Sequence, residues 1–116
     1  MIMLHQMKLR AAPFDMIARG IKTIELRLYD EKRRLIKVGD EIEFTHSKDS
    51  TRVLRCRVTA LHTFPSFAEL YANLPLLKCG YTADDIATAS PDDMDLYYSK
   101  EKQEKYGVVG IEIELI

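Results

Sequence analysis

The chain has no tryptophan, only two cysteines and no long apolar run. Cys56 alternates with apolar residues and Cys79 precedes a glycine, so two reduced thiols are expected. The three histidines are far apart in sequence and match no zinc-site spacing, so we expect no metal and no cofactor. Without a membrane-spanning run or a signal-peptide pattern, we expect a cytoplasmic protein with no membrane partner.

A large net charge is also missing. The chain has 17 Lys and Arg against 18 Asp and Glu, a net charge of −1, which argues against a strong, indiscriminate nucleic-acid binder. The charges are unevenly placed, because residues 1–58 contain 13 basic and 8 acidic side chains and residues 59–116 contain 4 and 10. This asymmetry allows a local site for an anionic ligand; the alternative is that both halves simply solvate the surface.

A length of 116 residues predicts a single domain over residues 1–116. Alternating apolar residues predict five strands, over 3–10, 23–29, 41–45, 52–61 and 108–116. Helical periodicity predicts one helix ending at Gly20 and three short helices between 65 and 107, the last from Ser90 to Gly107. Short connections between the second, third and fourth strands favour antiparallel pairing. The expected class is α+β, with a mainly antiparallel sheet or partly closed barrel and flanking helices.

The segment Gly20-Ile21-Lys22-Thr23-Ile24-Glu25-Leu26-Arg27 joins the first helix to the second strand. Glycine ends a helix readily because it adopts the left-handed conformation without a Cβ clash. Alternation then places Ile24, Leu26 and Leu28 on one face of the strand, and Thr23, Glu25, Arg27 and Tyr29 on the other. The apolar face predicts a core contact, and the charged face predicts the lining of a polar cleft.

Lys22, Glu25 and Arg27 allow two interpretations. Lysine binds anions, glutamate accepts a proton or pairs with a cation, and arginine offers a planar fork for phosphate or carboxylate. The alternative is an ion pair between Glu25 and Arg27 with Lys22 in solvent, contributing roughly 0–1 kcal/mol. The residues alone leave both open.

The octapeptide from Gly20 to Arg27 resembles the G-x-K-x-x-E-x-R signature of the ASCH domain, a branch of the PUA-like superfamily. The layout around it is also similar: the turn at residues 38–40, the aromatic helix through Tyr97 and Tyr98, and the closing segment 106–111. The resemblance covers essentially the whole chain and is to the small bacterial single-domain type. It implies a PUA-like β-barrel of about five strands, with a cleft beside the signature strand.

ASCH domains are generally held to bind RNA or nucleotides, so the resemblance implies a binding module for RNA, a nucleotide or a nucleoside. We expect six residues to contact the ligand: Lys22, Glu25, Arg27, Tyr29, Arg55 and Arg57. Tyr97 and Tyr98 are further stacking candidates, and their direction, toward the cleft or the core, stays open.

The alternative is a hydrolase acting on a modified nucleoside or an RNA phosphodiester, with Lys22 and Glu25 catalytic. Some small bacterial ASCH proteins are amidohydrolases that remove the acetyl group from acetylcytidine by means of a lysine, a threonine and a glutamate, and some relatives are reported as nucleases. Lys22 matches the lysine of the amidohydrolases, but Glu25 stands in the place of their threonine. The segment 78–80, which corresponds to the position of their glutamate, contains no acid.

Overall fold

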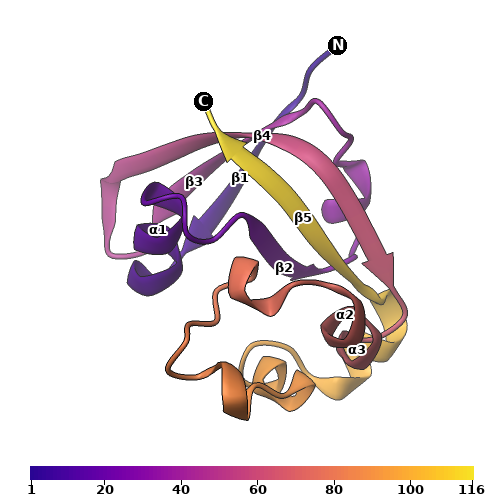
Figure 1. The fold of residues 1–116 in the computed structure, drawn as a ribbon. Helices are drawn as coiled ribbons and strands as arrows, with labels where there is room; N and C mark the ends of the chain where they lie inside the picture. Colours follow the sequence, from indigo (N-terminus) through magenta and orange to yellow (C-terminus); the bar gives the residue numbers. More distant parts are fainter.

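The computed structural model describes residues 1–116, which form a five-stranded sheet curved into a half-barrel (Figure 1). The strands are β1 (Leu4–Leu9), β2 (Ile24–Leu28), β3 (Glu41–His46), β4 (Asp49–Phe64) and β5 (Val108–Leu115). Their order in the sheet is β1-β3-β4-β5-β2, with β1 parallel to β3 and every other pair antiparallel. The predicted α+β class, with a mainly antiparallel, partly closed PUA-like barrel, is confirmed.

Two separate helices precede β3: α1 (Ala11–Ala18), which directly follows β1, and the 3₁₀ helix η1 (Arg33–Leu35) between β2 and β3. The other helices belong to an insertion between β4 and β5, called here the helical insertion (residues 65–107). It contains α2 (Phe67–Asn73), η2 (Leu76–Lys78), η3 (Ile86–Thr88), η4 (Pro91–Leu96) and α3 (Lys100–Tyr106), and it lies beside β2 in Figure 1. No helix has both the length and the apolar character needed to cross a membrane.

The pairing of β2 differs from the prediction. β2 pairs with β5, where Glu25 lies opposite Ile111, and not with β3. Residues 29–40, which connect β2 to β3, contain η1 and a turn at Gly39. This connection is too long for the short loop that would pair β2 and β3 as a hairpin. β3 instead pairs with β1 on one side and β4 on the other. Consequently β1 and β2 are the two edges of the sheet, and the half-barrel is open between them.

The prediction of one helix from Ser90 to Gly107 is wrong, because this segment contains two helices. Ser90 begins η4 with a capping box, as its position predicts. The hydroxyl group of Ser99 then accepts the N–H of Lys102 at 3.2 Å and begins α3, which ends at Gly107. A second serine cap therefore divides the helix.

A β-bulge in β4 changes which side chains face the core. The register with β5 shifts between Val58 and Ala60, and one extra residue reverses the alternation from that point onward. Cys56 and Val58 are buried. Simple alternation along residues 52–61 would place Leu61 on the opposite face of the strand, but Leu61 packs against the core instead.

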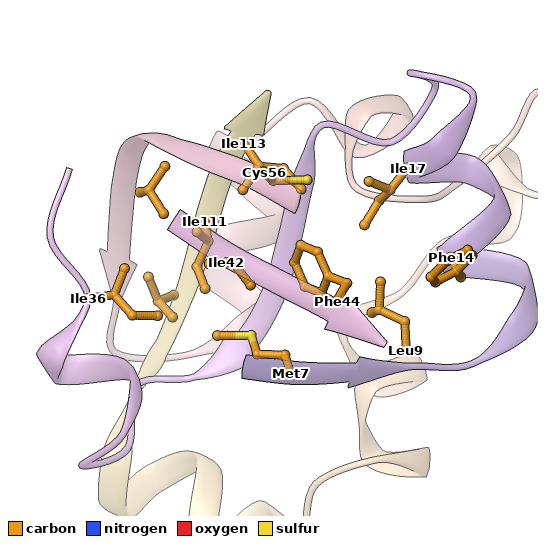
Figure 2. Packing of buried hydrophobic residues seen from close by; sticks show 12 residues of the cluster. Met7, Leu9, Phe14, Ile17, Ile36, Ile42, Phe44, Cys56, Ile111 and Ile113 are labelled. Atoms are coloured by element: carbon orange, nitrogen blue, oxygen red, sulfur yellow. The ribbon is translucent and has the colours of Figure 1, made fainter. Parts of the chain in front are cut away.

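Two hydrophobic clusters stabilise the fold. The first fills the half-barrel (Figure 2) and consists of Met7, Leu9, Phe14, Ile17, Ile36, Ile42, Phe44, Cys56, Val58, Val109, Ile111 and Ile113. The second joins β2 to the helical insertion and consists of Ile24, Leu26, Leu28, Phe67, Leu70, Cys79, Met94 and Val108. Each fully buried aliphatic side chain contributes about 1.5–3 kcal/mol. The apolar face of β2 is thus anchored, which fixes the position of the charged side chains on its other face.

Candidate functional site

The end of α1 determines where Lys22 lies. Gly20 has a φ of 75°; its N–H donates to the carbonyl of Ile17 at 3.0 Å, and the N–H of Ile21 donates to the carbonyl of Met16 at 2.9 Å. This pair of bonds is a Schellman motif. The N–H of Lys22 also donates to the Met16 carbonyl, at 3.1 Å. The chain therefore turns directly from the helix into the strand, with Lys22 at the turn.

Lys22, Glu25 and Arg27 come together as one group, called here the charged triad. The Nζ atom of Lys22 lies 2.8 Å from Oε1 of Glu25, and the Nε atom of Arg27 lies 2.8 Å from Oε2. Lys22 and Glu25 are only 8% and 4% exposed. The alternative of a surface ion pair with Lys22 in solvent is therefore wrong, since both cations bind one buried carboxylate.

The environment of Glu25 keeps it ionised. Burial by itself raises the pKa of this carboxyl group, but the charges of Lys22 and Arg27 outweigh burial and lower the pKa below its ordinary value. The triad carries a net charge of about +1 with all three groups ionised. Lysine has three N–H donors and arginine has five, so both cations keep donors that Glu25 does not use.

Arg27 also bridges the two edges of the half-barrel. Its Nη2 atom donates to the backbone carbonyl of Lys8 at 2.8 Å. Lys8 lies on β1 and Arg27 on β2, the two strands between which the barrel is open. The triad therefore lies at this opening.

A cavity of about 550 Å³, called here the cleft, lies at the same opening. All three members of the triad line it. The side formed by β1 and the start of α1 adds Lys8 and Arg10, and the helical insertion adds Asp85 and Asp93. The basic and acidic halves of the sequence thus face each other across the cleft.

The loop after η2 packs against Lys22. Gly80 has a φ of +112°, and a Cβ atom on it would lie 3.4 Å from Cδ and 3.6 Å from Nζ of Lys22. These are ordinary van der Waals distances, so the positive φ, and not a lack of space beside Lys22, is what favours glycine here. The neighbouring Cys79 also lines the cleft, and burial raises the pKa of its thiol to about 11, so it is neutral and unreactive at neutral pH.

Three polar side chains of the helical insertion form a hydrogen-bonded chain on the cleft wall. The hydroxyl oxygens of Tyr71 and Tyr81 are 2.7 Å apart, and the Tyr81 hydroxyl donates to Oδ2 of Asp93 at 2.7 Å. No sequence pattern predicted this chain. Its members belong to α2, a loop and η4, and no fixed spacing links them.

Tyr97 and Tyr98 both line the cleft, which answers the question that the sequence left open. Tyr98 is half-buried and stacks on Phe67 with 6.2 Å between ring centres, so it also packs within the insertion. Tyr97 is 49% exposed and accepts a hydrogen bond from the side chain of Arg10, whose guanidinium carbon lies 4.4 Å from the Tyr97 ring centre. This pair joins the two sides of the cleft at its exposed rim.

Tyr29, Arg55 and Arg57 are not among the residues that line the cleft. Tyr29 packs against the half-barrel cluster, with the guanidinium carbon of Arg34 4.3 Å from its ring centre. Arg55 and Arg57 both pair with Glu41 of β3, on the side of the sheet opposite the core. The structure therefore does not bring these three predicted contact residues to the triad.

No group of three or more His, Cys, Asp or Glu side chains is arranged to hold a metal ion. Two of the histidines pair with single acids, since His5 lies 2.9 Å from Asp40 and His62 lies 2.7 Å from Glu112. Cys56 and Cys79 are unpaired, and each is buried in a different hydrophobic cluster. The charged triad, in contrast, lines the cleft as one connected group.

Comparison with known families and structures agrees with the signature. A family model described as the ASCH domain matches residues 7–116. The crystal structure of hypothetical protein PH0355 superposes with a TM-score of 0.81 at 35% identity, covering 98% of this chain and 100% of that one. Protein PF0455 from Pyrococcus furiosus gives a TM-score of 0.72 at 33% identity, covering 98% of each chain. No curated protein gave a significant match.

A more distant structure shares the fold. The ASCH domain from Lactobacillus crispatus JV V101 superposes with a TM-score of 0.67 at 14% identity, covering 97% of this chain and 79% of that one. This chain covers PH0355 and PF0455 almost completely, which agrees with the expected small single-domain type. The bacterial part of that expectation is not shown, since PF0455 comes from the archaeon Pyrococcus furiosus.

Proposed function

The chain belongs to the ASCH domain family, and on that premise we propose that it binds RNA or a free nucleotide in the cleft around the charged triad. RNA or nucleotide binding is the activity expected of this family. One observation carries the proposal: two cations, the buried Lys22 and the partly buried Arg27, are held by a single carboxylate and line a cavity of about 550 Å³. Their unused N–H groups suit a phosphate or carbonyl oxygen.

The size of the cleft favours one nucleotide unit. Its volume of about 550 Å³ lies within the range of roughly 300–1,000 Å³ typical of small-molecule pockets. Proteins that recognise RNA sequence mostly read unpaired bases, which they stack on aromatic side chains or arginine planes. We therefore propose that the ligand is a free nucleotide or one unpaired nucleotide of an RNA, with Tyr97 and Arg10 available for stacking at the rim.

A hydrolase is the alternative, with Lys22 stabilising an oxyanion and Glu25 as general base. The geometry supports binding better, because both oxygens of Glu25 are bonded to cations and its pKa is lowered. A general base works best with a pKa near the working pH. Turnover of acetylcytidine and of short RNAs is the measurement, with Lys22→Met and Glu25→Gln in parallel. We expect wild-type rates no higher than those of the variants; turnover lost in both variants would support the hydrolase instead.

Calorimetric titration with a mononucleotide and a short single-stranded RNA tests the binding proposal. Lys22→Met keeps an unbranched side chain in the same space but removes the charge. Hydrogen bonds to charged groups contribute about 1.5–3 kcal/mol, so we expect binding to weaken by roughly tenfold or more. Arg55→Gln is the matched control, because it removes a cation outside the cleft, and we expect mononucleotide affinity to stay within about twofold. Absence of wild-type binding, or equal losses in both variants, would overturn the proposal.

A further inference from the structure

Given nucleotide binding in the cleft, on which this step rests, we propose that the cleft selects nucleobases with an exocyclic amino group, cytosine and adenine, over those with a carbonyl at the same position. Tyr71, Tyr81 and Asp93 set this preference through the direction of their hydrogen bonds. Tyr71 is the residue that contacts the base; Tyr81 and Asp93 are positioning residues that act through it.

The carboxylate of Asp93 fixes the direction of the chain. It accepts the Tyr81 hydroxyl at 2.7 Å and the N–H of Ser90 at 3.1 Å, and these bonds lower its pKa below the ordinary value. An ionised carboxylate has no proton to donate, so Tyr81 is the donor. A tyrosine hydroxyl has one proton, which Tyr81 has then given to Asp93. The proton of the 2.7 Å bond between Tyr71 and Tyr81 therefore comes from Tyr71.

The hydroxyl oxygen of Tyr71 is consequently an acceptor for any third partner. Its bond to Tyr81 is the one hydrogen bond that this hydroxyl makes within the protein, and Tyr71 lines the cleft. A ligand N–H at this position gains a hydrogen bond. A ligand carbonyl at the same position meets a lone pair, because the Tyr71 proton is already directed at Tyr81.

The β2 side of the cleft has the opposite character. Lys22 and Arg27 are donors only, so they require an acceptor on the ligand. Cytosine and adenine present an amino donor beside a ring-nitrogen acceptor. The amino group matches the Tyr71 acceptor on one wall, and the ring nitrogen matches the Lys22 and Arg27 donors on the other. Uracil and hypoxanthine carry a carbonyl beside a ring N–H, which reverses the pattern. A mismatch of this kind leaves buried polar groups unpaired, and we expect it to weaken binding by roughly tenfold.

Affinities for four mononucleotides, CMP, UMP, AMP and IMP, test the preference. For the wild-type protein we expect CMP to bind about tenfold more tightly than UMP, and AMP about tenfold more tightly than IMP. In Tyr81→Phe the Tyr71 hydroxyl loses its acceptor and becomes free to donate, so both ratios fall to about one or reverse. In Tyr71→Phe the ratios also fall to about one, through weaker CMP and AMP binding. Tyr106→Phe is the control, since it removes a tyrosine hydroxyl outside the cleft and keeps both ratios.

A modified ligand tests the same claim without any variant. CMP dimethylated at its amino nitrogen has no amino proton to donate, so we expect the wild-type protein to bind it no more tightly than UMP. Retained CMP-like affinity would overturn the preference, as would wild-type ratios near one, or ratios unchanged in both Tyr81→Phe and Tyr71→Phe.

Lys22→Met, measured with the same four nucleotides, separates this claim from nucleotide binding itself. Binding that weakens in Lys22→Met but shows no amino preference contradicts the role of the tyrosine chain and leaves the proposed function intact. If none of the four nucleotides binds, or if their affinities are unchanged in Lys22→Met, the proposed function is contradicted and the preference with it.

Discussion

The carboxylate of Glu25 pairs with two cations, Lys22 and Arg27, and is almost completely buried. Its removal leaves Lys22 and Arg27 close together without a compensating charge. Removing one partner of a buried ion pair costs about 3–5 kcal/mol, whereas an exposed pair contributes about 0–1 kcal/mol. Because Glu25 is only 4% exposed, we treat its ion pairs as buried ones.

Glu25→Gln is therefore expected to lower the free energy of unfolding by about 3 kcal/mol at pH 7. Urea denaturation followed by circular dichroism measures this change. Glu43→Gln is the matched control, because it removes a carboxylate paired with the half-exposed Arg55, and its loss should be much smaller. Equal small losses in the two variants would show that the triad stabilises the fold no more than a surface pair does.

The same carboxylate makes stability depend on pH in acid. The pKa of Glu25 is lower in the folded protein than its ordinary value of 4.5. Its contribution is therefore complete above about pH 4.5 and is lost as the pH falls toward the folded pKa. Asp40 acts in the same direction, because hydrogen bonds, first that of His5, lower its pKa from 3.8. We expect the unfolding free energy of the wild-type protein to decrease below pH 4.5 and that of Glu25→Gln to decrease less steeply. Identical slopes would contradict this role of Glu25.

Part of the site could be predicted from the residues alone. Alternation along one strand placed Glu25 and Arg27 on the same face, and the signature singled out Lys22. The burial of Lys22 and Glu25 could not be predicted, because it depends on the helical insertion, which follows far later in the chain. Tyr71, Tyr81 and Asp93 gave no signal, since they meet only when three separate segments of the insertion fold together.

The turn between α1 and β2 is the element that delivers Lys22 to the cleft. It requires a positive φ at Gly20, where a side chain costs roughly 1–2 kcal/mol. Gly20→Ala should lower the free energy of unfolding by about 1 kcal/mol, and Gly20→Asn by less, because asparagine tolerates the left-handed conformation better. Chemical denaturation of the wild type, Gly20→Ala and Gly20→Asn ranks their free energies of unfolding. An alanine variant as stable as the wild type would show that this turn does not need the left-handed glycine.

Elements with local signals were predicted better than elements with distant partners. Gly20 ends α1 and Ser90 begins η4, because both signals lie within a few residues of the helix end. The pairing of β2 with β5 was missed, since the partner strand lies at the other end of the chain. The position of Leu61 was missed because a bulge shifts the register without a clear mark in the sequence.

The whole molecule places its two oppositely charged halves on the two sides of the cleft. Lys8 and Arg10 of the basic half face Asp85 and Asp93 of the acidic half, within a chain whose net charge is −1. Within the cleft, positive charge thus lies mainly on the side formed by β1, β2 and the start of α1. This distribution would allow a nearly neutral protein to hold the proposed anionic ligand.

Because the proposed site is small, we expect the proposed RNA binding to be only moderately sensitive to salt. For a single strand, the logarithm of the association constant falls with the logarithm of salt concentration by about 0.7 for each phosphate contacted. One or two contacts predict a slope between about −0.7 and −1.4 for a short RNA. Titrations at several salt concentrations measure this slope. A slope steeper than about −4 would indicate a long phosphate-binding surface and contradict the small cleft.

The most direct test is to map ligand contacts by titrating ¹⁵N-labelled protein with CMP and following the amide signals by NMR. The proposed cleft predicts the largest shifts at residues 22–27, Tyr71 and Gly80, with Arg55 and Arg57 on β4 unchanged. Shifts centred on β3 and β4 around Arg55 and Arg57, or no shifts at saturating CMP, would contradict nucleotide binding at the charged triad.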